Sequence, residues 1–430
     1  MVDDMRRLVD ENRRLKTAVK ELAVINEIAG VINSTMPVEE ISRRIMDKVV
    51  AALKASEAAV HLFSDKDDQL TPHTFVRGKQ DDSSTGKARL DITITGWIAR
   101  NNKPFVVNDI SKDPRFRDAN LGSVPVDSLL AVPLTAKGQL IGALTAFNSR
   151  NPEGFAENDI RLLTIIGVQS AQIIENARLY QEELHLRQLQ GEIKAAQKIQ
   201  EGFLPESNPE VNGFDIFGGS LAAKDVGGDF YDFIFSTTDK LYFSIGDVSG
   251  KGMPAALLMS TIQGQVRLLI SRNNSMSPAD ILWNLNQITY QLSQSTQFAT
   301  MMIGCMTAGN SSLILANGGH CYPIIIGADG LIREISESSL IVGIVEKAEF
   351  INTNVSLNQG DVLALASDGI DEAFNSNGDE FGLDQLKAVL LKSRDLSAQD
   401  IYKHVFQAIA DFRGEAEQSD DITLLIIKRD

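Results

Sequence analysis

The amino-acid sequence predicts an α+β protein of several domains, ending in a β-sandwich flanked by helices. Its 430 residues are too many for one ordinary hydrophobic core. Apolar residues recur with helical spacing in some segments and with strand-like spacing in others. These changes divide the chain into an N-terminal coiled-coil helix (1–30), an α+β domain (31–180), a long helical coiled-coil linker (181–204) and the β-rich domain (205–430).

The composition is that of a folded protein of the cytoplasm. Hydrophobic residues make up 43% and charged residues 23% of the chain, which is enough apolar material for real cores. No run approaches the roughly 18 to 20 apolar residues of a membrane span. The stretch MVDDMRRLVDENRRLK has no apolar signal-peptide core, so we expect no membrane association. The formal charge of −16 repels polyphosphate backbones, so we expect no nucleic-acid partner.

The first segment carries a heptad repeat. Apolar residues occupy both seam positions, with Leu8, Leu15, Leu22 and Ala29 at one and Ala18, Ile25 and Ile32 at the other. Such a stripe favours a parallel helical dimer. The alternative is an amphipathic helix packed on its own domain, because Glu11 interrupts one seam position and so short a repeat is marginal.

Residues 31–180 mix helical and strand-like patterns. A helix is expected through Ile41, Ile45, Val49 and Leu53, with short strands at AAVHLF, HTFV and PFVV. The stretch SLLAVPLTAKGQLIGALTAFN predicts a hairpin whose strands join at Lys137-Gly138. Helical spacing resumes after Phe155, so we expect an α+β domain framed by helices.

The same segment resembles a GAF domain. The resemblance rests on the order and spacing of GWIARNNKPFVVND, the DPRF turn, the SLLAVPL hairpin and the closing helix FAENDIRLLTIIGVQSAQIIENARLY. It implies a sensor of a small molecule or of redox state, often dimeric. A cyclic nucleotide is not supported, because Ser149 and Ile160 replace the lysine and the glutamate of that signature. The GAF ligand is therefore left unidentified.

The helix that closes this domain continues beyond it. Apolar residues keep a helical spacing until Pro205 ends the pattern, at Leu184, Leu186, Leu189, Ile193, Ala196, Ile199 and Phe203. So long a helix predicts a second coiled coil, and the two together predict a homodimer. Gly191 interrupts the stripe, either as a hinge or as a tolerated surface glycine.

The β-rich domain places acidic residues at the ends of apolar strands. They are Asp229 in VGGDFYDFIF, Asp247 in LYFSIGDVSGKG, Asp368 in LALASDGIDEAF, and Asp420 and Asp421 in QSDDITLLII. Each alone is more typical of an ordinary turn or of a solvated strand start. Together, and without matching arginines, they indicate a bound cation, because desolvating an unpaired carboxylate costs several kcal/mol. Oxygen ligands without histidine or cysteine favour Mg²⁺ or Mn²⁺, and two such ions can activate water for phosphoryl transfer.

Residues 205–430 also resemble the PPM-type phosphatase domain, in the branch of stage II sporulation protein E and the RsbU regulators of sigma factors. The matching stretches follow the family order: AAQKIQEGFLP, VGGDFYDF, SIGDVSGKGMPAALLM, FATMMIG, ANGGHCYPIII, LALASDGIDEAF and SDDITLLII. The resemblance implies two Mn²⁺ or Mg²⁺ ions held by Asp229, bridging Asp247, the carbonyl of Val248, Asp368 and Asp420.

The resemblance leaves four further residues with open roles. Asp232 and Asp421 are candidates to support the metal ligands, and Asp421 competes with Asp420 as the direct ligand. Lys224 and Lys251 either contact substrate phosphate or are ordinary surface lysines.

The function that the resemblance implies is that of a metal-dependent serine/threonine protein phosphatase. Water activated between two ions would attack phosphorus directly, without a phosphoenzyme. The implied substrate is a phosphorylated anti-sigma-factor antagonist of the STAS type, in a partner-switching pathway regulated through the GAF-like domain. The alternative is a catalytically inactive scaffold that binds partners through the same domains, although retention of the aspartates argues against it.

Other motifs are excluded by their residues. The stretch GDVSGKG is one residue short of a phosphate-binding P-loop, and Gly252 replaces its Ser or Thr. In GGDF, Phe230 replaces the glutamate of the GGDEF signature of diguanylate cyclases. We assign no catalytic role to His320, and we expect Cys305 and Cys321 in the core.

Overall fold

The computed structural model describes residues 36–63, 72–77, 84–116, 126–236, 240–273, 275–292 and 297–430, with a few isolated positions before residue 20. The chain forms two compact units, residues 1–188 and 189–430. The predicted N-terminal coiled coil lies mostly outside the described residues, so its pairing stays a prediction. No described helix is both long and apolar enough to cross a bilayer.

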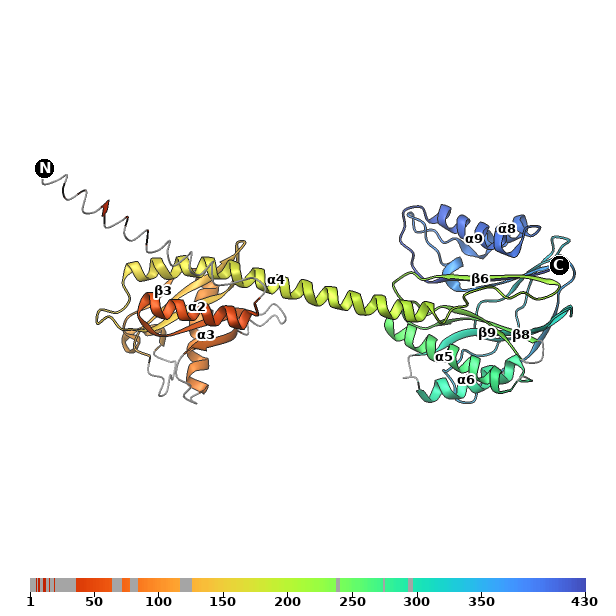
Figure 1. Cartoon of the computed structure of the whole chain (residues 1–430), viewed down its shortest axis with the longest axis horizontal. Helices are drawn as coiled ribbons and strands as arrows, with labels where there is room; N and C mark the ends of the chain where they lie inside the picture. Colours follow the sequence, from red (N-terminus) through yellow and green to blue (C-terminus); the bar gives the residue numbers. More distant parts are fainter. Residues whose placement is uncertain are drawn as a thin grey trace. The chain divides into compact units, whose positions relative to one another are not determined.

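The first unit is a five-stranded antiparallel sheet with helices on both faces (Figure 1). The strand order is β2-β1-β5-β4-β3. Its elements are α2 (Val38–Leu53), β1 (Ala55–Phe63), β2 (Pro72–Arg77), α3 (Ser84–Asn101), β3 (Phe105–Val107), the short 3-10 turns η1 (Ile110–Lys112) and η2 (Pro114–Phe116), β4 (Leu129–Ala136), β5 (Gln139–Ser149) and the start of α4 (Glu157–Glu201).

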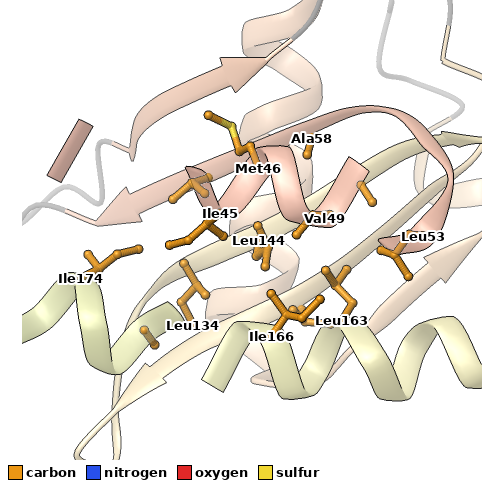
Figure 2. Packing of buried hydrophobic residues seen from close by; sticks show 14 of the residues in the cluster. Ile45, Met46, Val49, Leu53, Ala58, Leu134, Leu144, Leu163, Ile166 and Ile174 are labelled. Carbon is orange, nitrogen blue, oxygen red and sulfur yellow. The ribbon is translucent and has the colours of Figure 1, made fainter. Parts of the chain in front are cut away.

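Two hydrophobic cores cover the two faces of this sheet. Figure 2 shows the apolar face of α2 meeting α4 over the sheet, with side chains such as Ile45, Val49, Leu163 and Ile166 in contact around Leu144. The side chains of α3 pack on the other face with the alternate strand residues. This alternation follows from the two-residue period of a strand.

The predicted hairpin is confirmed as β4 and β5. Ala136 pairs with Gln139, so Lys137 and Gly138 form a two-residue turn. Both residues have positive φ angles, 50° and 83°, as such a turn requires. Glycine adopts this conformation without strain, which explains the Lys-Gly pair.

The helix α4 belongs to both units, because the division after Gln188 falls within it. It continues through Gly191, where an added Cβ would meet no atom within 4 Å. The helix ends at Glu201, shortly before Pro205. The structure therefore contains the continuous helix that the apolar spacing predicted, and its pairing with a second copy stays a prediction.

The second unit is a sandwich of two five-stranded antiparallel sheets, ordered β13-β10-β9-β8-β7 and β12-β11-β14-β15-β6. Its elements are β6 (Phe214–Leu221), β7 (Phe230–Phe235), β8 (Lys240–Val248), α5 (Met253–Arg272), α6 (Pro278–Leu292), β9 (Ala299–Thr307), β10 (Ser312–Gly318), β11 (Ile324–Ile326), β12 (Ile332–Glu334), β13 (Thr353–Ser356), β14 (Val362–Ala366), α7 (Asp368–Asp371), α8 (Gly382–Ser393), α9 (Ala398–Arg413) and β15 (Ile422–Arg429).

The layers of the sandwich follow from strand alternation. In β8, Phe243 and Ile245 face the core between the sheets, whereas Tyr242 faces α5 and α6. In β15, Leu425 faces the same inter-sheet core, whereas Leu424 faces α8 and α9. Figure 1 shows the two helix pairs on opposite sides of the sandwich, which matches the expected helix-flanked architecture.

Candidate metal centre

The pairing of β7 with β8 brings Asp229 and Asp247 together. Asp229 immediately precedes β7, and Asp247 lies near the end of β8. The strands are antiparallel with Phe230 opposite Gly246, so the next pair in register is Asp229 and Asp247. Asp229 is only 6% exposed, and its Oδ2 atom has no hydrogen-bond partner among the described residues.

These two carboxyl groups are costly to ionise without a cation. Burial raises the pKa of Asp229 well above its usual value, and the neighbouring charge of Asp247 adds to the effect. Burial, with the charges of Asp368 and Asp420, raises the pKa of Asp247 to about 7. A bound divalent ion would reverse this penalty, because an opposite charge favours the ionised carboxylate.

The second sheet brings Asp368 and Asp420 to the same place. Asp368 begins α7 directly after β14, and Asp420 stands just before β15. The ends of these two strands are joined by a bond from the Ser367 amide to the Thr423 carbonyl (3.0 Å). Burial raises the pKa of Asp368, and the charge of Asp420 raises it further. The four aspartates therefore come in pairs, one pair from each sheet.

A glycine leaves room for the carbonyl that was predicted as a ligand. A Cβ added to Gly228 would lie 2.7 Å from the Val248 carbonyl oxygen and 3.3 Å from Asp247 Oδ1. These two oxygens therefore lie beside one another against the Gly228 backbone. The Val248 amide also donates to the Gly228 carbonyl (3.3 Å), which fixes the end of β8 against this loop.

Asp421 supports the loop that carries Asp229. Its carboxylate accepts hydrogen bonds from the backbone amides of Ala223 (2.8 Å), Gly228 (2.7 Å) and Asp229 (3.4 Å). With its oxygens engaged in this way, Asp421 serves to hold the loop. The Asp420 carboxylate has fewer backbone contacts, since it accepts one amide hydrogen bond, from Asp421 (2.9 Å).

Asp420 already has a cationic partner. Lys251 Nζ lies 2.8 Å from Asp420 Oδ2 and also donates to the Ser419 carbonyl at 2.8 Å. Lys251 lies in the turn between β8 and α5, between Gly250 and Gly252, both with positive φ angles. Lys224 is exposed in the loop before β7. The structure thus gives Lys251 a defined place at the site.

Asp232, a candidate to support the metal ligands, is paired with an arginine of α5. Its buried carboxylate receives two hydrogen bonds from Arg267 of α5, at 2.7 and 2.8 Å, and one from the Phe233 amide. This ion pair joins α5 to β7. Asp232 therefore stabilises the packing of a helix on the sheet and is not seen to contact the metal-ligand candidates.

The donor set fits a hard divalent cation. The candidate ligand atoms are all oxygens, as Mg²⁺ and Mn²⁺ prefer. Among the described residues, the Asp229 Oδ2 atom is buried and accepts no hydrogen bond, so it is the clearest candidate to bind a cation. Within the described part of the chain, no three His, Cys, Asp or Glu side chains form a ready-made coordination group. The fit therefore rests on the chemistry and burial of the oxygens.

Sequence reasoning did not identify two groups of residues around this site. Ser367 and Thr423 lie beside Asp229 and favour its ionised form, against the effect of burial. Gln200, at the end of α4, hydrogen-bonds the backbone of Gly227. Gln200 lies in the family stretch AAQKIQEGFLP, which was the only signal in the sequence for it. The predicted non-catalytic His320 is buried and lies 2.9 Å from the Thr300 hydroxyl.

Comparison with known proteins agrees with both units. The family model "Stage II sporulation protein E (SpoIIE)" matches residues 237–430, and the model "GAF domain" matches residues 35–175. "Phosphoserine phosphatase RsbU" of Bacillus subtilis is 29% identical over 58% of this chain and 75% of its own length. "Protein IcfG" of Synechocystis is 25% identical over 55% of this chain and only 41% of its own length.

A solved structure supports the fold of the second unit. The SiaA-PP2C domain of Pseudomonas aeruginosa matches with a TM-score of 0.52 and 21% identity, over 57% of this chain and 99% of that domain. At this identity the match concerns the fold alone.

Proposed function

We propose that this chain, in which a GAF domain precedes a phosphatase domain of the stage II sporulation protein E type, is a metal-dependent protein phosphatase. Its substrate would be phosphoserine or phosphothreonine in a partner protein. The relative named as a phosphoserine phosphatase supports this reaction. The proposed sensor comprises residues 31–180, the linker residues 181–204 and the phosphatase domain residues 205–430.

The observation that carries the proposal is the pairing of buried Asp229 with half-buried Asp247 beside the Val248 carbonyl. Their raised pKa values mean that ionising both carboxyl groups at neutral pH is unfavourable without a bound cation. Oxygen ligands of this kind hold Mg²⁺ or Mn²⁺ in proteins. We propose two such ions, with Asp368 and Asp420 completing the ligand set from the second sheet.

The ions, when bound, would supply an activated water and positive charge for the phosphoryl oxygens. The chain itself holds and orients the ligands. Asp421 fixes the loop before Asp229 through its backbone amides. Lys251 stands at the edge of the site with its ammonium group on Asp420. It is the better placed of the two predicted lysines for contact with substrate phosphate.

The test is hydrolysis of a phosphoserine peptide with Mn²⁺ and with EDTA. Wild type is expected to be active only with metal, and Asp229→Asn is expected to lose activity by several orders of magnitude. Asp225→Asn is the matched control, because Asp225 is an exposed aspartate in the same loop. An inactive wild type that still binds partner proteins would favour the scaffold alternative, and an active Asp229→Asn would overturn the assigned site.

The proposed substrate is a phosphorylated STAS-type anti-sigma-factor antagonist, as the family resemblance implies. A phosphorylated STAS protein should be hydrolysed with a higher kcat/KM than a short phosphoserine peptide, because a folded substrate offers further contacts. Equal values for the two substrates would count against this substrate class. We also propose that the chain forms a homodimer through its helical segments, and sedimentation of the full chain tests this. The GAF domain is proposed to bind a small molecule.

A further inference from the structure

The last turn of α4 is attached to the loop that carries Asp229. The Nε2 atom of Gln200 donates to the Gly227 carbonyl at 2.6 Å, and the Gly227 amide donates back to Gln200 Oε1 at 3.1 Å. One side-chain amide therefore satisfies both backbone groups of a single residue. The neighbouring residue Ile199 is 66% exposed, so Gln200 is the inward member of this turn.

The loop is held from its other side by Asp421. Gly227 is buried, and a Cβ at this position would collide with the Asp421 carboxylate. The next residue, Gly228, donates its amide to that carboxylate at 2.7 Å. The backbone just before Asp229 thus lies between Gln200 of α4 and Asp421, the residue immediately before β15.

The segment after α4 is fixed independently of Gly227. Gln263 of α5 donates to the Phe203 carbonyl at 2.8 Å, and Arg267 donates to the same oxygen at 3.3 Å. These bonds hold the chain as it leaves the helix. They give the last turn of α4 a stable position from which Gln200 reaches the loop.

We propose that Gln200 is a positioning residue of the metal centre, which sets the orientation of Asp229 through the Gly227 backbone. This inference rests on the proposed function. Residues that orient metal ligands typically change metal affinity or activity by about 10- to 100-fold when they are removed. The hydrogen bonds of Gln200 go to Gly227 and Met259 and to none of the candidate ligand side chains, so its effect would pass through the loop.

The experiment compares three variants of the full-length protein. Gln200→Met keeps the length of the side chain and its packing near Met259 but deletes both hydrogen bonds. Gln190→Met makes the same chemical change at an exposed position of the same helix. Gln263→Met removes a bond to the segment after α4 and leaves the Gly227 contacts in place.

The readouts are Mn²⁺ affinity by calorimetric titration, hydrogen exchange of a peptide containing Gly227, and kcat and KM for a phosphoserine peptide. Gln200→Met should weaken Mn²⁺ binding by about tenfold, accelerate exchange at Gly227 and lower kcat with little change in KM. Gln190→Met should match wild type. Gln263→Met should lower the unfolding midpoint without the change in Mn²⁺ affinity.

The outcomes separate this proposal from the proposed function. If Gln200→Met speeds exchange at Gly227 but keeps the Mn²⁺ affinity and kcat of wild type, the positioning role is wrong while the phosphatase assignment stands. If Gln263→Met weakens Mn²⁺ binding as much as Gln200→Met, the effect is structural and the proposal also falls. A wild type that binds Mn²⁺ without hydrolysing phosphoserine overturns the phosphatase alone, because the affinity readout still tests Gln200. A wild type that binds no Mn²⁺ overturns both.

Discussion

Replacing Asp247 with asparagine is expected to stabilise the metal-free protein while removing its metal affinity. The pKa of Asp247 is raised from 3.8 to about 7, first by burial and then by the charges of Asp368 and Asp420. The folded state therefore holds more protons than the unfolded state between these pH values, so stability is lost as pH rises through this window. Asparagine carries no charge, so the stability of the variant should not fall in this pH window.

The size of the effect follows from the shift. About three pKa units at 1.36 kcal/mol each give an upper bound of about 4 kcal/mol for the gain in free energy of unfolding. We expect a gain of about 2 to 4 kcal/mol, because the ionisation of Asp247 depends on that of Asp229. Above pH 7 the variant should show the full gain in free energy of unfolding. Near pH 4 the gain from charge removal should vanish, because the wild-type carboxyl group is then protonated in the folded state.

The assay is calorimetric unfolding in EDTA at pH 4.5 and pH 8, with hydrogen exchange of β8 peptides to assign the transition to the second unit. Excess Mn²⁺ should then stabilise wild type strongly and leave Asp247→Asn almost unchanged. Asp225→Asn, an exposed aspartate, should behave as wild type throughout. An Asp247→Asn protein that is less stable than wild type at pH 8 in EDTA would refute the reasoning.

Three further predictions concern neighbouring residues. Gly228→Ala should weaken Mn²⁺ binding about tenfold or more in calorimetric titration, because its methyl group would lie 2.7 Å from a carbonyl oxygen, whereas Gly191→Ala, with open space around it, should not. Arg267→Met should lower the free energy of unfolding in urea by about 2 kcal/mol, because Asp232 stays buried without its partner, and unchanged Mn²⁺ affinity would confirm a purely structural role. Burial lowers the pKa of His320 to about 4, so its folded state resists protonation, and stability should fall by up to about 3 kcal/mol as pH drops from 6.5 to 4. His320→Asn should flatten that slope in acid-unfolding curves, and an unaltered slope would contradict the argument.

Much of the fold could be predicted from local pattern. The Lys137-Gly138 turn was visible because a two-residue hairpin needs positive φ angles and the flanking strands alternate. The position of Asp247 at a strand end could be predicted because an apolar run precedes it and a glycine-rich turn follows. Its contact with Asp229 required the register between β7 and β8, which no local pattern specifies.

The roles of individual acidic residues depended on contacts distant in sequence. Asp420 and Asp421 are adjacent and alike in the sequence, and their partners distinguish them: backbone amides for Asp421 and Lys251 for Asp420. Asp232 was a candidate to support the metal ligands because it lies three residues after Asp229, whereas its partner Arg267 lies on a later helix. Gln200 lies in a stretch that resembles the family, but its role depends on hydrogen bonds to Gly227, which is 27 residues away in the sequence.

The origin of the candidate ligands in two separate sheets has a mechanical consequence. Spacing within each pair of aspartates is set by one hydrogen-bonded ladder, whereas spacing between the pairs is set by how the sheets are seated on the core between them. Apolar residues of that core, such as Ile245 and Leu365, therefore set the width of the site without touching it. A slight sliding of one sheet over the other would change all the distances between the two pairs of candidate ligands at once, so the affinity of the proposed metal site would depend on the alignment of the sheets.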